Sequence, residues 1–218
     1  GWRPEIIMDS ILFSAGTQRQ VASQDWHSEV IAGGYRAAIF DCDGTLVDSS
    51  ETHFQSFQYA VRSQGHDMDR DWYFGRTGLD RASLFGAFAK EAEGELNVAL
   101  AVQDSIAAFV LNAENVSPIL ETVELLKALE PSFPKAVGTN AEASVALASL
   151  QATGLIDYFD RIVSISEHLP PKPAPDIFLN AREYLGCPAA NTLVFEDTDE
   201  GVRAALAAEL DVIQLIHC

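Results

Sequence analysis

Apolar residues along the chain fall into two patterns, short runs and longer stretches with helical spacing. The first run, residues 37–40, stops at the polar, glycine-containing segment Asp41-Cys42-Asp43-Gly44-Thr45. A short apolar run that ends at such a turn is typical of a buried β-strand. Runs that predict further strands occur at residues 135–138, 161–164, 192–195 and 212–215.

Stretches with apolar residues at helical spacing separate these runs. They cover residues 118–130, 141–152, 175–185 and 200–208. Strands that alternate with helices of this length predict right-handed crossovers and a parallel sheet covered on both faces. The pattern therefore predicts an α/β fold.

Residues 50–115 break this alternation, because their apolar residues recur at helical spacing only. We interpret them as an all-helical insertion that follows the first strand and is large enough to form a lid. Regular patterning begins after Gly33-Gly34, so residues 1–34 are expected to be an N-terminal leader, to which we assign no role. The predicted division is a leader at 1–34, an α/β core at 35–49 and 116–218, and a helical cap at 50–115.

The charge balance restricts the partners that the protein can have. The 218 residues include 14 Lys and Arg against 32 Asp and Glu, a formal net charge of −18. Nucleic acid and anionic membranes both require a basic surface, so neither is an expected partner. An anionic substrate would need positive charge supplied within the site.

Cysteine content and hydropathy bear on where the protein works. The three cysteines are an odd number without metal-ligand spacing, which indicates a reducing compartment and no disulfide framework. The apolar runs are far shorter than the roughly 18 residues of a membrane span. We expect a cytoplasmic protein, with a monomer favoured.

Polar residues whose side chains can take part in catalysis or ligand binding follow four of the predicted strands. Asp41 and Asp43 follow the first; Thr139 and Asn140 follow the second. Lys172 comes shortly after the third, and Glu196 and Asp197 end the fourth. Ligand sites of open α/β sheets lie at the carboxyl ends of the strands, so these side chains are expected to share one edge.

The chemistry of this set suits a phosphate ester and Mg²⁺. Carboxylates held together repel unless a cation lies between them, and Mg²⁺ prefers carboxylate, water and phosphate oxygens. The expected metal ligands are Asp41, Asp43, Glu196 and Asp197. Asp41 is the candidate nucleophile, Asp43 the candidate general acid and base, and Lys172 a fixed positive charge. Thr139 and backbone N–H groups of the first loop are expected to hold the phosphoryl oxygens.

Four segments together resemble the motifs of the haloacid dehalogenase-like superfamily of phosphatases. Residues 41–49, DCDGTLVDS, resemble its first motif, and residues 137–140, VGTN, its second. Residues 172–178, KPAPDIF, resemble the third, and residues 195–205, FEDTDEGVRAA, the fourth. The resemblance covers roughly residues 36–216. It implies a Rossmann-like parallel sheet with an inserted helical cap, and a hydrolase that forms an aspartyl-phosphate on Asp41.

The helical insertion resembles the cap of a branch that contains β-phosphoglucomutase and sugar phosphatases of the fructose-1-phosphate type. By this resemblance His53, Thr77 and Arg81, with Gly44 and Asn140, are expected to contact a small phosphorylated metabolite such as a sugar phosphate. Arg76 is an alternative to Arg81 as the cation of the cap.

Three other functions are open alternatives to a phosphatase. In a phosphomutase the aspartyl-phosphate passes to a sugar hydroxyl; mutase-like members tend to carry lysine where this chain has Thr77. Removal of halide needs no proton donor to the leaving group, so Asp43 argues against a dehalogenase. A non-catalytic binding protein would have no need of the intact set of Asp41, Asp43, Thr139 and Lys172.

Overall fold

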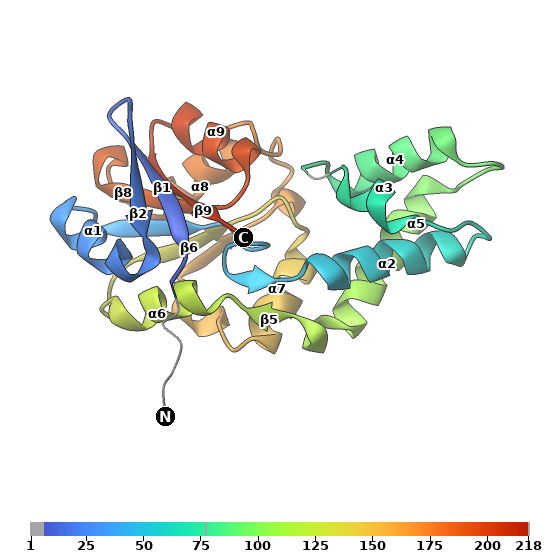
Figure 1. Ribbon diagram of the computed structural model, residues 1–218, viewed down its shortest axis with the longest axis horizontal. Coiled ribbons are helices and arrows are strands. Elements are labelled where there is room, and N and C mark those ends of the chain that lie inside the picture. The colour runs from blue at the N-terminus through green and yellow to red at the C-terminus, as the bar shows by residue number, and fades with distance from the viewer. Residues whose placement is uncertain (1–6, 77, 218) are drawn as a thin grey trace.

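The computed structural model describes residues 7–76 and 78–217 as a seven-stranded sheet flanked by helices, with a group of four helices beside it (Figure 1). The order of strands is β2-β1-β9-β8-β3-β6-β7. These strands are β1 (Asp9–Ser14), β2 (Thr17–Ala22), β3 (Ala37–Phe40), β6 (Lys135–Gly138), β7 (Arg161–Val163), β8 (Thr192–Glu196) and β9 (Asp211–Ile216). All five strands predicted from the sequence are present.

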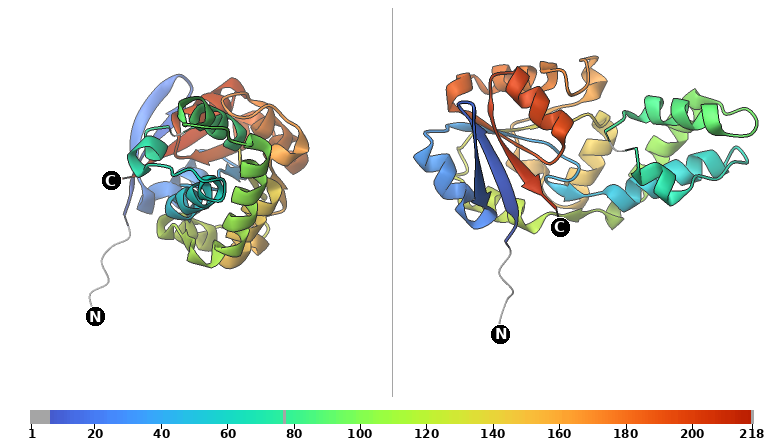
Figure 2. Two further views of the ribbon diagram at one scale, coloured as in Figure 1. Left: turned by 90° about the vertical axis from the view of Figure 1, so that its right-hand side faces the viewer. Right: turned by 45° about the horizontal axis from the view of Figure 1, so that its top comes forward.

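Helices cover both faces of this sheet (Figure 2). They are α1 (Trp26–Ala32), α6 (Leu120–Ala128), α7 (Ala143–Ala152), α8 (Asp176–Leu185) and α9 (Asp199–Ala207). Because successive side chains of a strand point to opposite faces, β3 serves two cores. Phe40 packs in the core under α1, α6 and α7, and Ile39 packs in the core under α8 and α9. The predicted α/β sheet covered on both faces is confirmed.

The N-terminal segment corrects the sequence analysis, which placed the start of regular structure after Gly33-Gly34. Strands β1 and β2 form a hairpin, and β1 pairs antiparallel with β9, so the segment belongs to the sheet. Its strands gave no signal because β2 is an edge strand whose first four residues, Thr17 to Gln20, are all exposed and polar. The sheet is therefore parallel from β9 to β7 and antiparallel at the hairpin.

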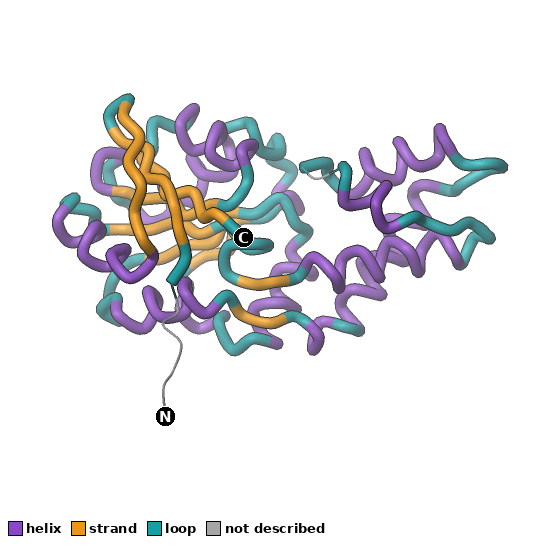
Figure 3. The backbone as a smooth tube through the Cα atoms, in the orientation of Figure 1, coloured by secondary structure: helices purple, strands orange, loops and turns teal. Residues whose placement is uncertain are grey.

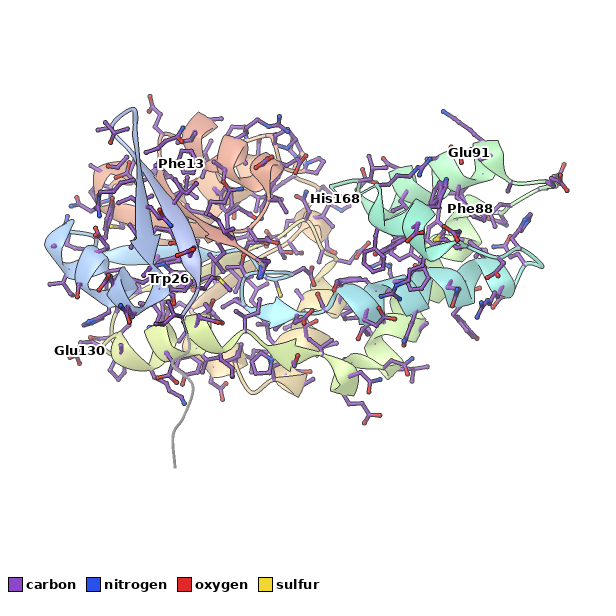
Figure 4. The ribbon with its side chains drawn as sticks, viewed as in Figure 1. Phe13, Trp26, Phe88, Glu91, Glu130 and His168 are labelled. Carbon is purple, nitrogen blue, oxygen red and sulfur yellow. The ribbon has the colours of Figure 1, made fainter. Side chains whose placement is uncertain are left out.

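The group of four helices is built from residues 50–111. Its helices are α2 (Ser50–Arg62), α3 (Arg70–Phe74), α4 (Arg81–Glu91) and α5 (Val98–Leu111). Aromatic side chains fill its own apolar core, and Figure 4 shows Phe88 in this group, far from Trp26 of α1. We call this group the cap.

Two chain crossings connect the cap to the sheet. Short strands β4 (Val47–Asp48) and β5 (Ser117–Pro118) pair antiparallel at these crossings, and Figure 3 shows them as a separate ribbon of strand. Single turns of 3-10 helix occur at η1 (Ser23–Asp25), η2 (Ala113–Asn115), η3 (Ile156–Tyr158), η4 (Ile165–Glu167) and η5 (Ala189–Asn191). Within the described ranges, every helix is too short or too polar to cross a membrane.

Trp26 joins the N-terminal segment to the central sheet. Its side chain is fully buried, its indole N–H donates to Ser10 Oγ at 2.9 Å, and its ring packs edge-on against Phe195 of β8 with the centroids 5.5 Å apart. Loss of a buried tryptophan removes both its apolar contacts and its hydrogen bond.

We therefore predict that Trp26→Ala lowers the free energy of unfolding by about 3–5 kcal/mol, measured by urea denaturation. Ile31→Ala on the same helix, where the side chain is 63 % exposed, is the control and should change stability by less than about 0.5 kcal/mol. A loss of under about 1 kcal/mol for Trp26→Ala would show that the segment is not part of the cooperative core.

Candidate active site

Lys172 connects three strand ends at the carboxyl edge of the sheet. Its ammonium group donates to Asp41 Oδ1, to Glu196 Oε2 and to the carbonyl of Gly138, each at 2.8 Å. Its side chain is only 4 % exposed. Burial alone would lower the pKa of Lys172, but the carboxylates of Asp41 and Glu196 raise it above its usual value.

Asp41, Glu196 and Asp197 form an acidic cluster beside this ammonium group. Each offers a carboxylate oxygen, and these oxygens all lie within 4.8 Å of one another. Burial and the charge of Glu196 raise the pKa of Asp41 to about 7. Burial and the charges of Asp41 and Glu196 raise the pKa of Asp197 to about 10. One ammonium group is too little to keep three neighbouring carboxylates ionised, so without a further cation the cluster lowers its negative charge by taking up protons.

This donor set fits a divalent cation. Buried oxygen donors from two strand ends are the ligands that hard cations prefer, and a cation would offset the excess negative charge. Glu196 has limited freedom, since its Oε1 already accepts from the N–H groups of Asp197 and Thr198 and its Oε2 accepts from Lys172. The carboxylate oxygens of Asp41 and Asp197 accept fewer hydrogen bonds and are more available to coordinate a cation.

Gly44 brings the first loop close to the acidic cluster. Its φ is +80°, a conformation that favours glycine. A Cβ atom at this position would lie 2.0 Å from Asp197 Oδ2, so only glycine fits. The loop therefore packs against Asp197 through its backbone.

Asp43 lies apart from the acidic cluster, although the sequence analysis expected it among the metal ligands. Its Oδ1 accepts from the hydroxyl of Ser49 and lies 2.9 Å from Nε2 of His53. Burial would raise the pKa of Asp43, but His53, Ser49 and the charge of Arg81 lower it to about 2. The carboxylate is thus held in its ionised form.

His53, which was expected to contact substrate, also contacts Asp43. It lies in the first turn of α2, and its ring stacks on Phe109 of α5 with the centroids 4.3 Å apart. This packing fixes the ring plane and aims Nε2 at the carboxylate. The contact joins the cap to the catalytic loop of the sheet.

Thr139 and Asn140 lie directly after β6, as the sequence analysis expected. Thr139 is buried, and its Oγ1 accepts from the N–H of Ala141, which leaves its own O–H free to donate. The Oδ1 atom of Asn140 accepts from the backbone N–H of Lys172 at 2.9 Å. Asn140 therefore positions the loop that carries Lys172.

The two candidate cations of the cap both reach the site and both have acidic partners. Arg81 is 6 % exposed and contacts Glu142 through Nε at 2.8 Å and through Nη2 at 3.1 Å. Arg76 pairs with Glu91 at 3.0 Å and lies over the ring of Trp72. Thr77, the third expected cap contact, lies outside the described residues.

A cavity of about 930 Å³ lies between the sheet and the cap. It includes Asp43, Gly44, His53, Arg81, Asn140 and Asp197 of the predicted site. Met8, Glu142 and His217 also line it, and the sequence analysis missed all three. His217 lies 2.6 Å from the carbonyl of Gly44 through Nε2. Met8 and His217 reach the cavity because β1 runs antiparallel to β9, an arrangement with no signal in the sequence.

Comparisons with known proteins agree with this geometry. The family model described as haloacid dehalogenase-like hydrolase matches residues 38–215. Fructose-1-phosphate phosphatase YqaB of Escherichia coli is 32% identical over 182 residues, covering 83% of this chain and 96% of the relative. A phosphorylated carbohydrates phosphatase of Thermotoga maritima is 28% identical over 190 residues, covering 81% of this chain and 83% of the relative.

Solved structures show the same fold. The crystal structure of CbbY from Rhodobacter sphaeroides in complex with phosphate matches with a TM-score of 0.73 at 24% identity, covering 82% of this chain and 84% of that chain. The chain belongs to the haloacid dehalogenase-like hydrolase family, and the family resemblance inferred from its four motifs is confirmed.

The close approach of Gly44 to Asp197 generates a test of the acidic cluster. We predict that Gly44→Ala weakens binding of Mg²⁺ or Mn²⁺ by about tenfold or more, measured by calorimetric titration, because the added Cβ displaces the Asp197 carboxylate.

Gly16→Ala is the matched control for backbone strain. Gly16 has a φ of +74° and no atom within 4 Å of an added Cβ. Both variants should lose about 1 kcal/mol of stability, whereas only Gly44→Ala should affect metal binding. Equal metal affinities in the two variants would contradict the proposed cluster.

Proposed function

We propose that this hydrolase is a Mg²⁺-dependent phosphatase that removes phosphate from a small phosphorylated sugar through an aspartyl-phosphate on Asp41. The observation that carries the proposal is the contact of Lys172 Nζ with Asp41 Oδ1 at 2.8 Å, within an acidic cluster whose Asp197 lines the cavity. The names of the relatives from Escherichia coli and Thermotoga maritima support a phosphorylated sugar as substrate.

In the first step an oxygen of Asp41 attacks phosphorus and the bond from phosphorus to the sugar oxygen breaks. The sugar oxygen leaves with the electron pair and takes a proton from the carboxyl group of Asp43. Lys172 keeps Asp41 oriented and offsets the negative charge that gathers around the phosphoryl group. The product of this step is a phosphorylated Asp41 and a neutral sugar hydroxyl.

In the second step water attacks the phosphorus of the aspartyl-phosphate. Asp43, now ionised, accepts the proton of that water, and the bond from phosphorus to the Asp41 oxygen breaks. Inorganic phosphate leaves and the Asp41 carboxylate is restored.

The environment of Asp43 matches the second step directly. With a pKa of about 2, Asp43 is ionised in the substrate-free structure, which is the form that accepts a proton. The first step needs its protonated form. The negative charge of a bound phosphate raises the pKa of a neighbouring carboxyl group, which favours uptake of a proton when substrate binds.

The metal would be held by Asp41 and Asp197. Glu196 would contribute less, because both of its carboxylate oxygens already accept hydrogen bonds. When bound, Mg²⁺ would supply positive charge between the carboxylates and a substrate phosphate. We leave the carboxylate of Asp43 out of this set, because it is not among the oxygens that lie within 4.8 Å of one another and its Oδ1 already contacts Ser49 and His53.

The first test of the proposal is release of inorganic phosphate from sugar phosphates, with and without Mg²⁺. We predict that Asp41→Asn abolishes release, as does removal of divalent cations with a chelator, because each removes a component that the first step requires. Asp71→Asn, an exposed residue of α3, is the matched control and should retain full activity. Full activity of Asp41→Asn would rule out the nucleophile.

The contact of His53 with Asp43 generates a second prediction. We expect His53→Gln to lower kcat about tenfold with little change in KM, because the hydrogen bond that orients Asp43 is weakened while the phosphate contacts remain. His66→Gln is the control, since His66 does not line the cavity: its Nε2 lies 2.9 Å from the carbonyl of Glu95 and its ring packs edge-on against Phe88. A change in KM alone would instead place His53 among the substrate contacts.

A further inference from the structure

Three carboxylates that the proposed mechanism does not use line the cavity. Asp48 follows the catalytic loop, Asp80 precedes α4 of the cap, and Glu121 lies in the first turn of α6. None of the three takes part in an ion pair with another described residue. We call these three residues the acidic rim.

The basic side chains of the described cavity wall are all engaged by groups of the protein itself. Arg81 pairs with Glu142, and Arg76 pairs with Glu91. The two histidines of the wall contact the carboxylate of Asp43 and the carbonyl of Gly44. Lys172 is buried beneath the catalytic loop. Within the described wall, no cation is therefore available for a second anionic group on the substrate.

Hydrogen-bonding capacity leads to the same conclusion as charge. Ionised carboxylates only accept hydrogen bonds. Both oxygens of Asp80 already accept from Ser83, and Asp48 Oδ1 accepts from Ser50, so Glu121 and the second oxygen of Asp48 are the acceptors that the rim offers to a substrate. The hydroxyl groups of a sugar or polyol can donate hydrogen bonds to these carboxylates. An ionised carboxylate or a second ionised phosphate on the substrate cannot. Phe57, Tyr73 and Phe74 supply an apolar wall on the cap side, which also disfavours a charged group.

We propose that the acidic rim makes this enzyme selective for phosphate esters of neutral polyols or sugars, and that it discriminates against substrates whose leaving group carries a second negative charge. The proposal rests on the phosphatase activity proposed above and specifies its substrate class. Asp48 and Glu121 determine specificity because their carboxylates repel substrates with a negatively charged leaving group.

Pairs of substrates that differ only in the charge of the leaving group test the proposal. Glycerol 3-phosphate and 3-phosphoglycerate form one pair, and glucose 6-phosphate and 6-phosphogluconate form another. We expect kcat/KM to favour the neutral member of each pair by at least about tenfold at low ionic strength. In about 1 M salt, where the Debye length falls to about 3 Å, the ratio should shrink toward one.

Variants of Glu121 identify the source of the selectivity. Glu121→Gln should reduce the ratio about threefold, and Glu121→Lys should reduce it further, chiefly by faster turnover of the anionic member. Glu124→Gln is the matched control on the same helix, because Glu124 pairs with Lys127 at 3.8 Å and does not line the cavity. It should leave the ratio unchanged.

The possible outcomes separate this proposal from the one on which it rests. Phosphate release from both members at equal efficiency, or preference for the anionic member, would overturn the selectivity and leave the phosphatase activity standing. A preference that is insensitive to salt and to both Glu121 variants would overturn the role of the acidic rim. No release from any member would overturn the phosphatase proposal together with the selectivity.

Discussion

The buried ammonium group of Lys172 holds together strand ends that the chain order keeps far apart. It contacts Asp41 after β3, Glu196 at the end of β8 and the Gly138 carbonyl at the end of β6. Burial of three charged groups is unfavourable unless each finds partners of opposite charge or hydrogen bonds. The network therefore fixes the relative position of the strand ends and the orientation of the Asp41 carboxylate, the proposed nucleophile.

Around this network the structure separates two carboxylates of the same short loop by environment. Asp41 lies beside other carboxylates, which raises the pKa of its carboxyl group, whereas Asp43 lies beside His53 and Ser49, which lowers its own. Residues two apart on an extended segment can share a face, yet their partners differ because one faces the sheet edge and the other faces α2 of the cap. In the mechanism that we propose, this separation allows Asp41 to act as nucleophile while Asp43 gives and accepts the proton.

The arginine side chains of the cap that line the cavity contact groups of the protein itself, so the described part of the cap offers few cations for direct recognition of a substrate. Arg81 is held by Glu142 of the core, and His53 by Asp43, so two cap side chains make ionic or hydrogen-bonded contacts with the sheet domain. With its arginines engaged, the described cavity wall presents mainly acceptors and aromatic rings. In a chain of net charge −18, the ammonium group of Lys172 thus lies among three carboxylates at one end of the site, and Asp48, Asp80 and Glu121 line the cavity without ion pairs among the described residues.

The sequence by itself determined the strand ends and what they carry. Apolar runs of a buried parallel strand are continuous, so the sequence predicts β3 and β6 at their observed bounds, and Asp41 and Thr139 follow directly after them. The edge strand β2 is polar on both faces, and its pairing and that of β1 with β9 depend on distant residues, so the hairpin was missed. For the same reason only the tertiary structure decided that Arg81 meets Glu142, 61 positions away, and that Met8 and His217 reach the cavity. The local pattern of apolar and polar residues indicates which face of a segment is buried. The contact partner of a side chain instead depends on how segments that are far apart in the chain pack together.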